Sequence, residues 1–181
     1  KIFVEKHYTR AVKGGTGYAK VGGNYASSLI GQQKAEEMGY AQVLWLDGIE
    51  HKYIDEVGAM NVFFVVDGEV LTPSLDEGSI LPGVTRDSCI HLLKSWGYKV
   101  TERKISLEEI VRANEEGRLD EAFGTGTAAV ISPIGELNDD GNKMILNEGK
   151  IGPISQKLYD SLTAIQWGKA EGPEGWSVIV D

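Results

Sequence analysis

The 181-residue sequence lacks a long apolar run, and it carries only one cysteine, three histidines and five prolines. No stretch approaches the roughly 20 apolar residues that cross a bilayer, so a transmembrane segment is not expected. A single cysteine excludes an intrachain disulfide framework, which makes the cytoplasm the expected compartment. Cys89 lies in an apolar helical stretch, which predicts a buried, unreactive thiol.

Positive charge is also scarce, because 18 Lys and Arg face 27 Asp and Glu and leave a net charge of −9. Nucleic acids and anionic membranes are bound by basic patches, so neither is expected as a partner. The histidines His7, His51 and His91 are scattered without metal-ligand spacing, and no metal site is predicted. Ser27 and Ser28 have no visible partner base, which gives no support for serine-hydrolase chemistry.

What remains is the composition of an ordinary globular domain, with 41% hydrophobic and 25% charged residues. A chain of this length is expected to form one domain with one sizeable core. Its first residues lack the apolar core and cleavage site of a signal peptide. The chain also begins without Met in a strand-like pattern, which suggests a processed chain or an excised domain.

Period-two patterns and short apolar runs predict the strands of the fold. They lie over residues 1–13, 41–48, 61–66 and 99–105, with a small-residue strand and turn within 120–137 and a last strand at the C-terminal end. Hairpins are predicted at Asp67-Gly68 and within residues 138–146. The stretch 49–60 is interpreted as a polar connection.

Helical spacing predicts helices over residues 25–38 and 85–96, and a third with a capping box of Ser106 and Glu109. A last helix opens at Pro153, with an apolar stripe of Ile154, Leu158, Leu162 and Ile165. Asn24 can cap the first of these helices. Its apolar face would consist of Ala26, Leu29 and Ile30. Since strands and helices mix without strict βαβα alternation, the pattern favours an α+β fold or mixed sheet over a doubly wound Rossmann sheet.

A glycine-dense stretch, GGTGYAKVGGNYASS at residues 14–28, surrounds Lys20. Missing Cβ atoms would let a flat or phosphorylated ligand approach the backbone closely. The stretch has neither a Walker A pattern nor a GxGxxG fingerprint, and composition alone is typical of a flexible surface turn. Our hypothesis is that Lys20 forms an imine with a pyridoxal cofactor. A free lysine amine is mostly protonated at neutral pH, so such a site must desolvate the amine or hold it as an imine.

Three further motifs could contact an anionic or aromatic ligand. LPGVTR at residues 81–86 places Thr85 at a helix start, which is either an anion site or a plain helix terminus. GTGTA at 124–128 is either a nest for phosphate or carboxylate or a simple turn. DEVGAMN at 55–61 could hold a carboxylate against a pyridine nitrogen, or form a solvated acidic turn. Two candidate anion sites suit a ligand with two anionic groups.

Taken together, these residues resemble the branched-chain aminotransferases, a fold-type IV pyridoxal-phosphate family. GGTGYAKVGGNYASSL is similar to the family's cofactor-lysine segment, and QVLWLDG, DEVGAMN, ILPGVTR, AFGTGTA and IQWG follow in the family's order and approximate spacing. The resemblance covers essentially the whole chain. It implies a mixed, largely antiparallel sheet or pseudo-barrel with flanking helices. It also implies pyridoxal 5'-phosphate as cofactor, and amino-group transfer between Leu, Ile or Val and 2-oxoglutarate in branched-chain amino-acid metabolism.

The resemblance assigns roles around the cofactor ring residue by residue. Lys20 would be the catalytic residue, forming the imine and moving the proton between Cα and C4′. Glu56 would pair with the pyridine nitrogen. Tyr25 would lie near the cofactor O3′ and the substrate carboxylate. Arg10, on the strand leading to the lysine loop, is similar to a family arginine near the cofactor.

The resemblance also assigns the anion-binding groups. Val84 and Thr85 would hold the cofactor phosphate from a helix start, and Thr127 would bind it too. The Thr127–Ala128 backbone would receive the substrate carboxylate. Ala59 belongs to the same carboxylate site, where some family members have threonine, so one hydroxyl is lost there.

Two departures from the family affect the interpretation. Mammalian members carry a CxxC pair after the GTA turn, where this chain has Ala129 and Ser132, so thiol-based redox control is not expected. The family is also about twice as long, and its smaller N-terminal domain carries a further phosphate-binding arginine and part of the substrate pocket. The resemblance therefore identifies residues 1–181 as the large C-terminal domain of a two-domain enzyme, with a homodimer implied.

Other functions remain open at this stage. One is another fold-type IV enzyme, such as a D-amino-acid aminotransferase or an aminodeoxychorismate lyase. The other is a non-catalytic cofactor-binding or dimerisation domain.

Overall fold

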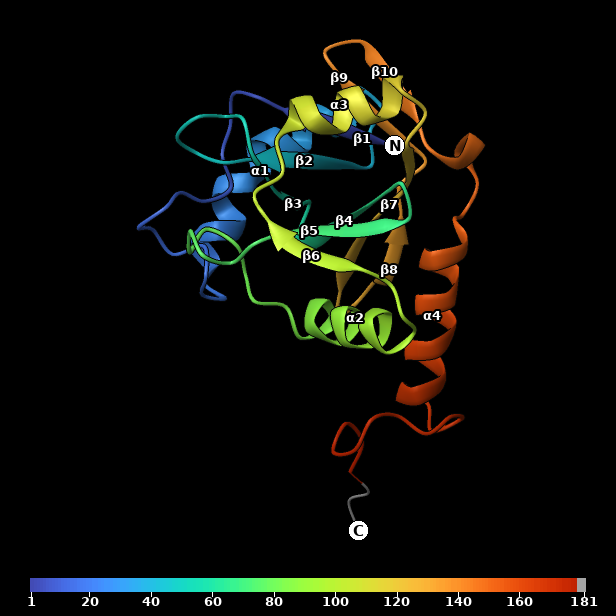
Figure 1. Ribbon diagram of the computed structural model, residues 1–181. Helices are drawn as coiled ribbons and strands as arrows, with labels where there is room; N and C mark the ends of the chain where they lie inside the picture. Colours follow the sequence, from blue (N-terminus) through green and yellow to red (C-terminus); the bar gives the residue numbers. More distant parts are fainter. Residues whose placement is uncertain (179–181) are drawn as a thin grey trace.

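One branched sheet runs through the computed structural model, which describes residues 1–178 (Figure 1). Its strands are β1 (Ile2–Glu5), β2 (Gln42–Leu46), β3 (Ile54–Val57), β4 (Met60–Val66), β5 (Glu69–Pro73), β6 (Val100–Arg103), β7 (Leu119–Gly126), β8 (Val130–Pro133), β9 (Glu136–Asp139) and β10 (Asn142–Ile145). The helices are α1 (Gly22–Glu37), α2 (Val84–Ser95), α3 (Leu107–Glu115) and α4 (Pro153–Gln166), with a 3-10 turn η1 (Asn147–Gly149).

The strands are ordered β10-β9-β1-β2-β3-β4-β5-β6, and β7 branches off by pairing with β4 and with β8. Only β1–β2, β1–β9 and β5–β6 are parallel, and the other six pairings are antiparallel. The mixed, largely antiparallel sheet with flanking helices is therefore confirmed.

Strand β4 is the centre of the fold because both of its faces are buried. Val62 and Phe64 face one apolar core, which α3 closes, while Phe63 and Val65 face a second core that α2 and α4 close. Figure 1 shows the same layering, with α3 on one side of β4 and β5 and with α2 and α4 on the other. A strand that is buried on both faces needs an uninterrupted apolar run, which explains the sequence NVFFVV.

Several predicted elements are confirmed at their predicted places. The hairpin between β4 and β5 turns at Asp67 and Gly68, both with positive φ. The Ser106 hydroxyl caps α3 by accepting from Glu109 N at 3.1 Å, although the Glu109 carboxylate pairs with Arg103 instead of closing the capping box. Helix α4 begins at Pro153 and buries its predicted apolar stripe.

The predicted first strand is too long, because β1 ends at Glu5. The Glu5 carboxylate accepts hydrogen bonds from the backbone N–H groups of His7 (2.6 Å) and Tyr8 (3.0 Å), which turns the chain away from the sheet. Arg10 therefore lies on the loop after β1 and not on a strand. The predicted C-terminal strand has no counterpart in residues 171–178, and the rest of it lies in 179–181, outside the described residues.

The polar connection predicted at residues 49–60 is wrong, because it contains β3, which is buried throughout. Asp55 and Glu56 are 7% and 3% exposed, so the solvated acidic turn is excluded as well. The acidic pair concealed the strand from pattern reasoning, since charged residues are rarely fully buried unless they are paired.

The apolar face predicted for the first helix is also wrong. Leu29 and Ile30 are 65% and 55% exposed, and α1 buries Asn24, Gly31 and Ala35 instead. A Cβ on Gly31 would lie 2.8 Å from the Trp45 ring, so a glycine is needed where the helix meets β2. The helix starts at Gly22, and Asn24 lies within its first turn and does not cap it.

Within residues 1–178, no helix combines the length and the apolar character that a membrane crossing requires, and no three His, Cys, Asp or Glu side chains group as metal ligands. Cys89 is buried, and the loss of hydration raises the pKa of its thiol to about 12. The cysteine is therefore an unreactive core residue, as predicted.

Replacing Phe63 tests the central position of β4. Its ring stacks on Phe123 with centroids 5.2 Å apart, and it is fully buried. We expect Phe63→Ala to lower the free energy of unfolding by about 3–5 kcal/mol, because it leaves a cavity between β4 and β7. Denaturant unfolding measures this loss. The matched control, Trp167→Ala at a side chain that is 76% exposed, should change stability by less than about 0.5 kcal/mol, and equal losses would contradict the prediction.

Candidate active site

The backbone segment 79–83, which precedes α2, contacts two of the predicted site residues, Arg10 and Glu56, and the loop that carries a third, Lys20. The Arg10 guanidinium donates a hydrogen bond to the carbonyl of Ser79, and both residues are buried. Gly17 of the lysine loop packs against the same carbonyl, where an added Cβ would lie only 2.1 Å from the oxygen. The loop that carries Lys20 can therefore approach segment 79–83 only with glycine at this position.

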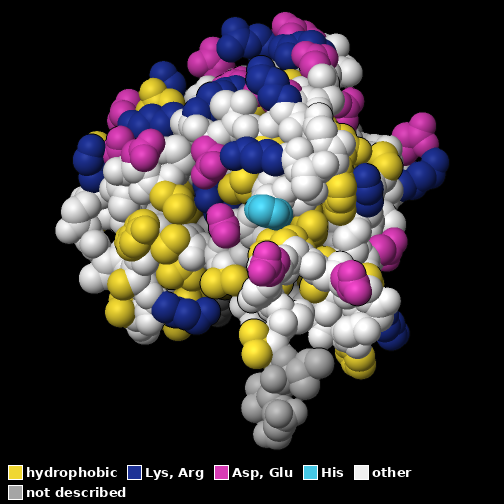
Figure 2. Space-filling model, turned by 60° about the horizontal axis from the view of Figure 1, so that its bottom comes forward, with side chains coloured by type: hydrophobic (Ala, Val, Ile, Leu, Met, Phe, Trp, Pro, Cys, Tyr) yellow, Lys and Arg dark blue, Asp and Glu magenta, His cyan; other side chains and the backbone are white. Residues whose placement is uncertain are grey.

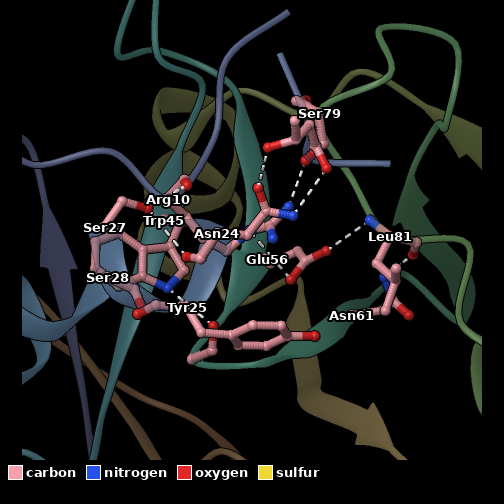
Figure 3. Close-up of polar contacts among 12 residues, drawn as sticks. Arg10, Asn24, Tyr25, Ser27, Ser28, Trp45, Glu56, Asn61, Ser79 and Leu81 are labelled. Carbon is pink, nitrogen blue, oxygen red and sulfur yellow. Dashed lines mark hydrogen bonds and ion pairs between the residues drawn. The ribbon is translucent and has the colours of Figure 1, made fainter. Parts of the chain in front are cut away.

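Glu56 and Asn61 hold the next part of this segment (Figure 3). The Glu56 carboxylate accepts from Leu81 N at 2.9 Å, and the Asn61 amide donates to Leu81 O at 2.8 Å. Glu56 and Asn61 are directly opposed in the β3–β4 ladder. One cross-strand pair thus satisfies both backbone polar groups of Leu81 and fixes the chain that enters α2.

The start of α2 is fixed by close packing as well. Gly83 precedes the helix, and a Cβ there would lie 2.2 Å from the Asn61 side-chain oxygen. No side chain caps this end, Val84 is 82% exposed and Thr85 is half-buried. The first N–H groups of a helix lack intrahelical partners and carry the positive end of its dipole. The α2 terminus is therefore an accessible place for an anion next to the Glu56–Asn61 pair.

Arg10 and Glu56 form a buried ion pair with Nε and Oε2 3.3 Å apart. Desolvation raises the pKa of Glu56 to about 7, although Arg10 and the Leu81 N–H act against the rise. Desolvation likewise raises the pKa of Asp55 to about 6, opposed by the Ser79 hydroxyl and Arg10. Glu56 is thus a buried group that can share a proton near neutral pH, which suits a partner for a basic ring nitrogen.

A row of polar side chains continues from Glu56 across the sheet. Asn61 pairs with Thr125 in the β4–β7 ladder, so Glu56, Asn61 and Thr125 lie side by side on one face. Thr125 is 1% exposed, and its hydroxyl oxygen has no hydrogen-bond partner among the described residues. A buried hydroxyl without a partner is uncommon in a folded protein and marks a place where a ligand atom could bind.

The same ladder brings together the two turns proposed for the substrate carboxylate. Because Asn61 opposes Thr125, the β3–β4 turn at Ala59 lies beside the β7–β8 turn at Thr127 and Ala128. These three residues are exposed. The structure therefore places them at one accessible edge, beyond the end of the polar row.

Lys20 and Tyr25 lie on the outer side of this arrangement. Lys20 is exposed, its amine lies 6.0 Å from the Tyr25 ring centroid, and Tyr25 is 38% exposed on α1. Seen with the lower face of Figure 1 turned forward, apolar side chains gather on the side where α1 lies (Figure 2). The exposed apolar residues of α1 and the loop before it include Tyr18, Val21, Tyr25, Leu29 and Ile30.

Sequence reasoning missed three residues that organise the site, namely Asn24, Asn61 and Ser79. Asn24 and Asn61 stand inside the motifs GGNY and DEVGAMN. The two residues are 4% and 6% exposed, and their amides bind backbone groups of neighbouring segments. The only available signal was a polar residue at a position that the fold buries, and burial is not visible from a local pattern. Ser79 acts chiefly through its carbonyl, which leaves no signal in the sequence.

Residues 4–137 match the amino-transferase class IV family, and the chain belongs to that family. The branched-chain-amino-acid transaminase 1 of Bacillus subtilis (strain 168) is 57% identical over 99% of this chain and 50% of its own length. A probable branched-chain-amino-acid aminotransferase of Staphylococcus aureus (strain N315) is 55% identical over the same shares. The resemblance drawn from the motifs is confirmed, and the chain spans about half the length of these relatives.

Solved structures agree with this relationship. The T.th. branched-chain amino acid aminotransferase, complexed with N-(5'-phosphopyridoxyl)-L-glutamate, superposes with a TM-score of 0.84 at 30% identity, over 100% of this chain and 56% of that one. The Escherichia coli branched-chain amino acid aminotransferase gives a TM-score of 0.80 at 34% identity, over 96% and 55% of the two chains. The fold is therefore that of the fold-type IV aminotransferases.

The raised pKa of Glu56 predicts a pH dependence of stability. A carboxyl group whose folded pKa of about 7 exceeds its ordinary value of 4.5 stabilises the fold below pH 4.5 and loses that contribution as pH rises through 7. Between pH 5 and pH 8, the cofactor-free wild-type chain should therefore lose up to about 3 kcal/mol more stability than Glu56→Gln does. Urea unfolding at both pH values measures the difference.

The control for this prediction is Glu115→Gln at an exposed residue of α3, which should follow the wild-type pH dependence. If the stability of Glu56→Gln changed with pH as steeply as that of the wild type, the raised pKa of Glu56 would not be the cause of the pH dependence.

Proposed function

We propose that the protein containing this chain is a pyridoxal 5'-phosphate-dependent aminotransferase. It moves amino groups between Leu, Ile or Val and 2-oxoglutarate in branched-chain amino-acid metabolism. The observation that carries the proposal is segment 79–83, which ties the Lys20 loop, the Arg10–Glu56 pair and the α2 terminus together. Residues 1–181 would be the cofactor-lysine-bearing C-terminal domain of a two-domain enzyme.

The residues present fit pyridoxal phosphate. Glu56 is buried beside Arg10, so its carboxylate is placed to accept a hydrogen bond from a protonated pyridine nitrogen. The uncapped α2 terminus offers N–H groups for a phosphate beside Gly83, where the side chain is absent. The Thr125 hydroxyl supplies a further polar atom without a partner among the described residues. Two solved structures of a relative carry a phosphopyridoxyl glutamate and pyridoxamine 5'-phosphate, which supports the same cofactor class here.

Bound pyridoxal phosphate would supply an electron-withdrawing ring and an aldehyde carbon to which amines attach with loss of water. Lys20 would provide the amine that holds the cofactor and later accepts and returns the substrate Cα proton. Glu56 would keep a proton at the ring nitrogen, and Arg10 would stabilise the Glu56 charge at 3.3 Å. Tyr25, on α1 next to Lys20, would hold the cofactor O3′ and contact the substrate carboxylate.

The anionic groups would bind at the two places described above. Val84, Thr85 and Thr127 would hold the cofactor phosphate. The edge formed by Ala59, Thr127 and Ala128 would receive the substrate carboxylate through backbone N–H groups. Another structure of the T.th. enzyme contains 4-methylvaleric acid, a branched aliphatic acid, which supports a branched side chain in the substrate.

This chain alone leaves the site open on one side, since Lys20 and Tyr25 are exposed and apolar residues of α1 face outward. The relatives are about twice as long as this chain. In the proposed enzyme, the additional domain would cover this open side of the site. A homodimer would cover further apolar surface. The single buried thiol supports a cytoplasmic location.

Cofactor attachment is tested on the full-length protein with pyridoxal phosphate, borohydride reduction and peptide mapping. We expect the label on Lys20, because the amine is accessible and its loop packs on segment 79–83. Lys20→Ala should abolish the label. Lys13→Ala, at an exposed lysine of the same region that pairs with Glu77, should retain it. A label on another lysine of the wild type, or no label, would refute the proposed function.

Substrate class is tested by amino-donor assays. The full-length protein should convert L-leucine with 2-oxoglutarate and leave D-alanine unused, and the reverse preference would identify another fold-type IV enzyme. The 181-residue chain alone should be slower by about 100-fold or more, because its site is open to water and its reactants are poorly oriented. Strong L-leucine turnover by the isolated chain would contradict this expectation.

A further inference from the structure

The side chain of Asn24 is buried inside the lysine loop, although the residue belongs to α1. Its amide nitrogen donates to the backbone carbonyls of Thr16 and Ala19, both at 2.8 Å. Its amide oxygen accepts from the Thr16 hydroxyl at 2.7 Å. Since carbonyl oxygens only accept, these contacts fix the orientation of the amide. Three hydrogen bonds therefore connect a 4% exposed asparagine to the residues just before Lys20.

None of these three hydrogen bonds caps the N-terminus of α1. The helix begins after Val21 without a side-chain cap, and the Asn24 backbone N–H already donates to Val21 O. All the partners of the side chain lie in residues 16–19, outside the helix. The loop itself is rich in glycine, and most of residues 12–20 are exposed, so the loop has little apolar packing to hold it. The amide of Asn24 is thus a principal restraint on the loop from the inside.

The second restraint is Gly17, which packs against the carbonyl of Ser79. Asn24 binds on either side of this contact, at Thr16 and at Ala19, and Lys20 follows directly. Ser79 in turn binds Arg10, and Leu81 binds Glu56. The position of the Lys20 backbone relative to Glu56 is therefore set through two contacts that keep the loop against segment 79–83.

We propose that Asn24 is a positioning residue for Lys20, holding the loop in the conformation from which the amine reaches the cofactor. The inference rests on the proposed function of Lys20. Without these bonds the Thr16 and Ala19 carbonyls keep only their partners within the loop, Ala19 N and Val21 N, and the loop samples conformations in which the amine is misplaced. Attachment of the cofactor to Lys20 then slows, because the fold no longer holds the Lys20 amine in the orientation that the reaction needs.

The test uses three variants of the full-length protein. Asn24→Ala removes all three hydrogen bonds. Thr16→Val, at an exposed residue, removes only the hydroxyl bond to the amide oxygen and leaves both carbonyl bonds. Gln33→Ala is the matched control, because it deletes an amide on the same helix whose partner, Glu37, lies within α1.

Hydrogen exchange without cofactor is the first measurement. Asn24→Ala should raise the exchange rate of residues 15–21 by at least about 10-fold and Thr16→Val by a smaller factor, with β4 and α2 unchanged. Gln33→Ala should leave the loop at the wild-type rate. Loop exchange that stays at the wild-type rate in Asn24→Ala, or that rises only together with β4, would overturn the proposal. If Asn24→Ala fails to fold, Thr16→Val decides, and unchanged loop exchange in it counts against the proposal.

The rate of borohydride-trapped attachment of pyridoxal phosphate to Lys20, at limiting cofactor, is the second measurement. It should fall about 10–100-fold in Asn24→Ala, fall less in Thr16→Val and stay unchanged in Gln33→Ala. A rate equal to that of Gln33→Ala would overturn the positioning role. Failure of the proposed function is distinguishable, because the wild type would then carry no label on Lys20 at all.

Discussion

The site depends on how the backbone of residues 79–83, buried at Ser79 and Ile80, finds its hydrogen-bond partners. Where such a segment lacks regular structure, side chains can supply the partners that a helix or a sheet would otherwise provide. Here the Ser79 carbonyl is bound by Arg10, and the two polar groups of Leu81 are bound by Glu56 and Asn61. The residues that satisfy this segment include Arg10 and Glu56, two charged residues of the candidate site, so the packing of the segment also determines the geometry around them.

The same contacts determine the electrostatic environment of Glu56. A buried carboxylate without a partner would cost several kcal/mol, and the Arg10 guanidinium at 3.3 Å offsets much of that cost. The offset is incomplete, and desolvation still raises the pKa of Glu56 to about 7. The protein thereby keeps a group in its interior whose protonation is balanced near neutrality. In the proposed enzyme, a basic ring nitrogen placed against it would share the proton and offset part of the desolvation cost.

Sequence reasoning predicted the elements whose signals are local. The run NVFFVV, the Asp67-Gly68 turn, the Ser106 cap and the α4 stripe all formed where predicted, because each depends on a few adjacent residues. It failed at β3, whose acidic residues are buried only because Arg10 and segment 79–83 arrive from elsewhere in the chain. It failed at α1 for the opposite reason, since the outward face carries Leu29 and Ile30 and the inward face carries Asn24 and glycine. The motif residues of the site were found by resemblance, and their supporting residues, Asn24, Asn61 and Ser79, became visible only through contacts distant in sequence.

The wrong predictions for β3 and α1 fall on two different sides of the site, one buried and one open to solvent. Its inner side is buried and held by hydrogen bonds, with Asn24, Asn61 and Glu56 each bonded to a backbone group at 2.8–2.9 Å. Its outer side is open, with Lys20 in solvent and apolar residues of α1 uncovered. Rigid placement determines where reacting groups stand, whereas exclusion of water determines how strongly they interact. In the proposed enzyme, this chain would meet the first requirement, and the open face of α1 is where the second would be met, on a chain about half as long as its relatives.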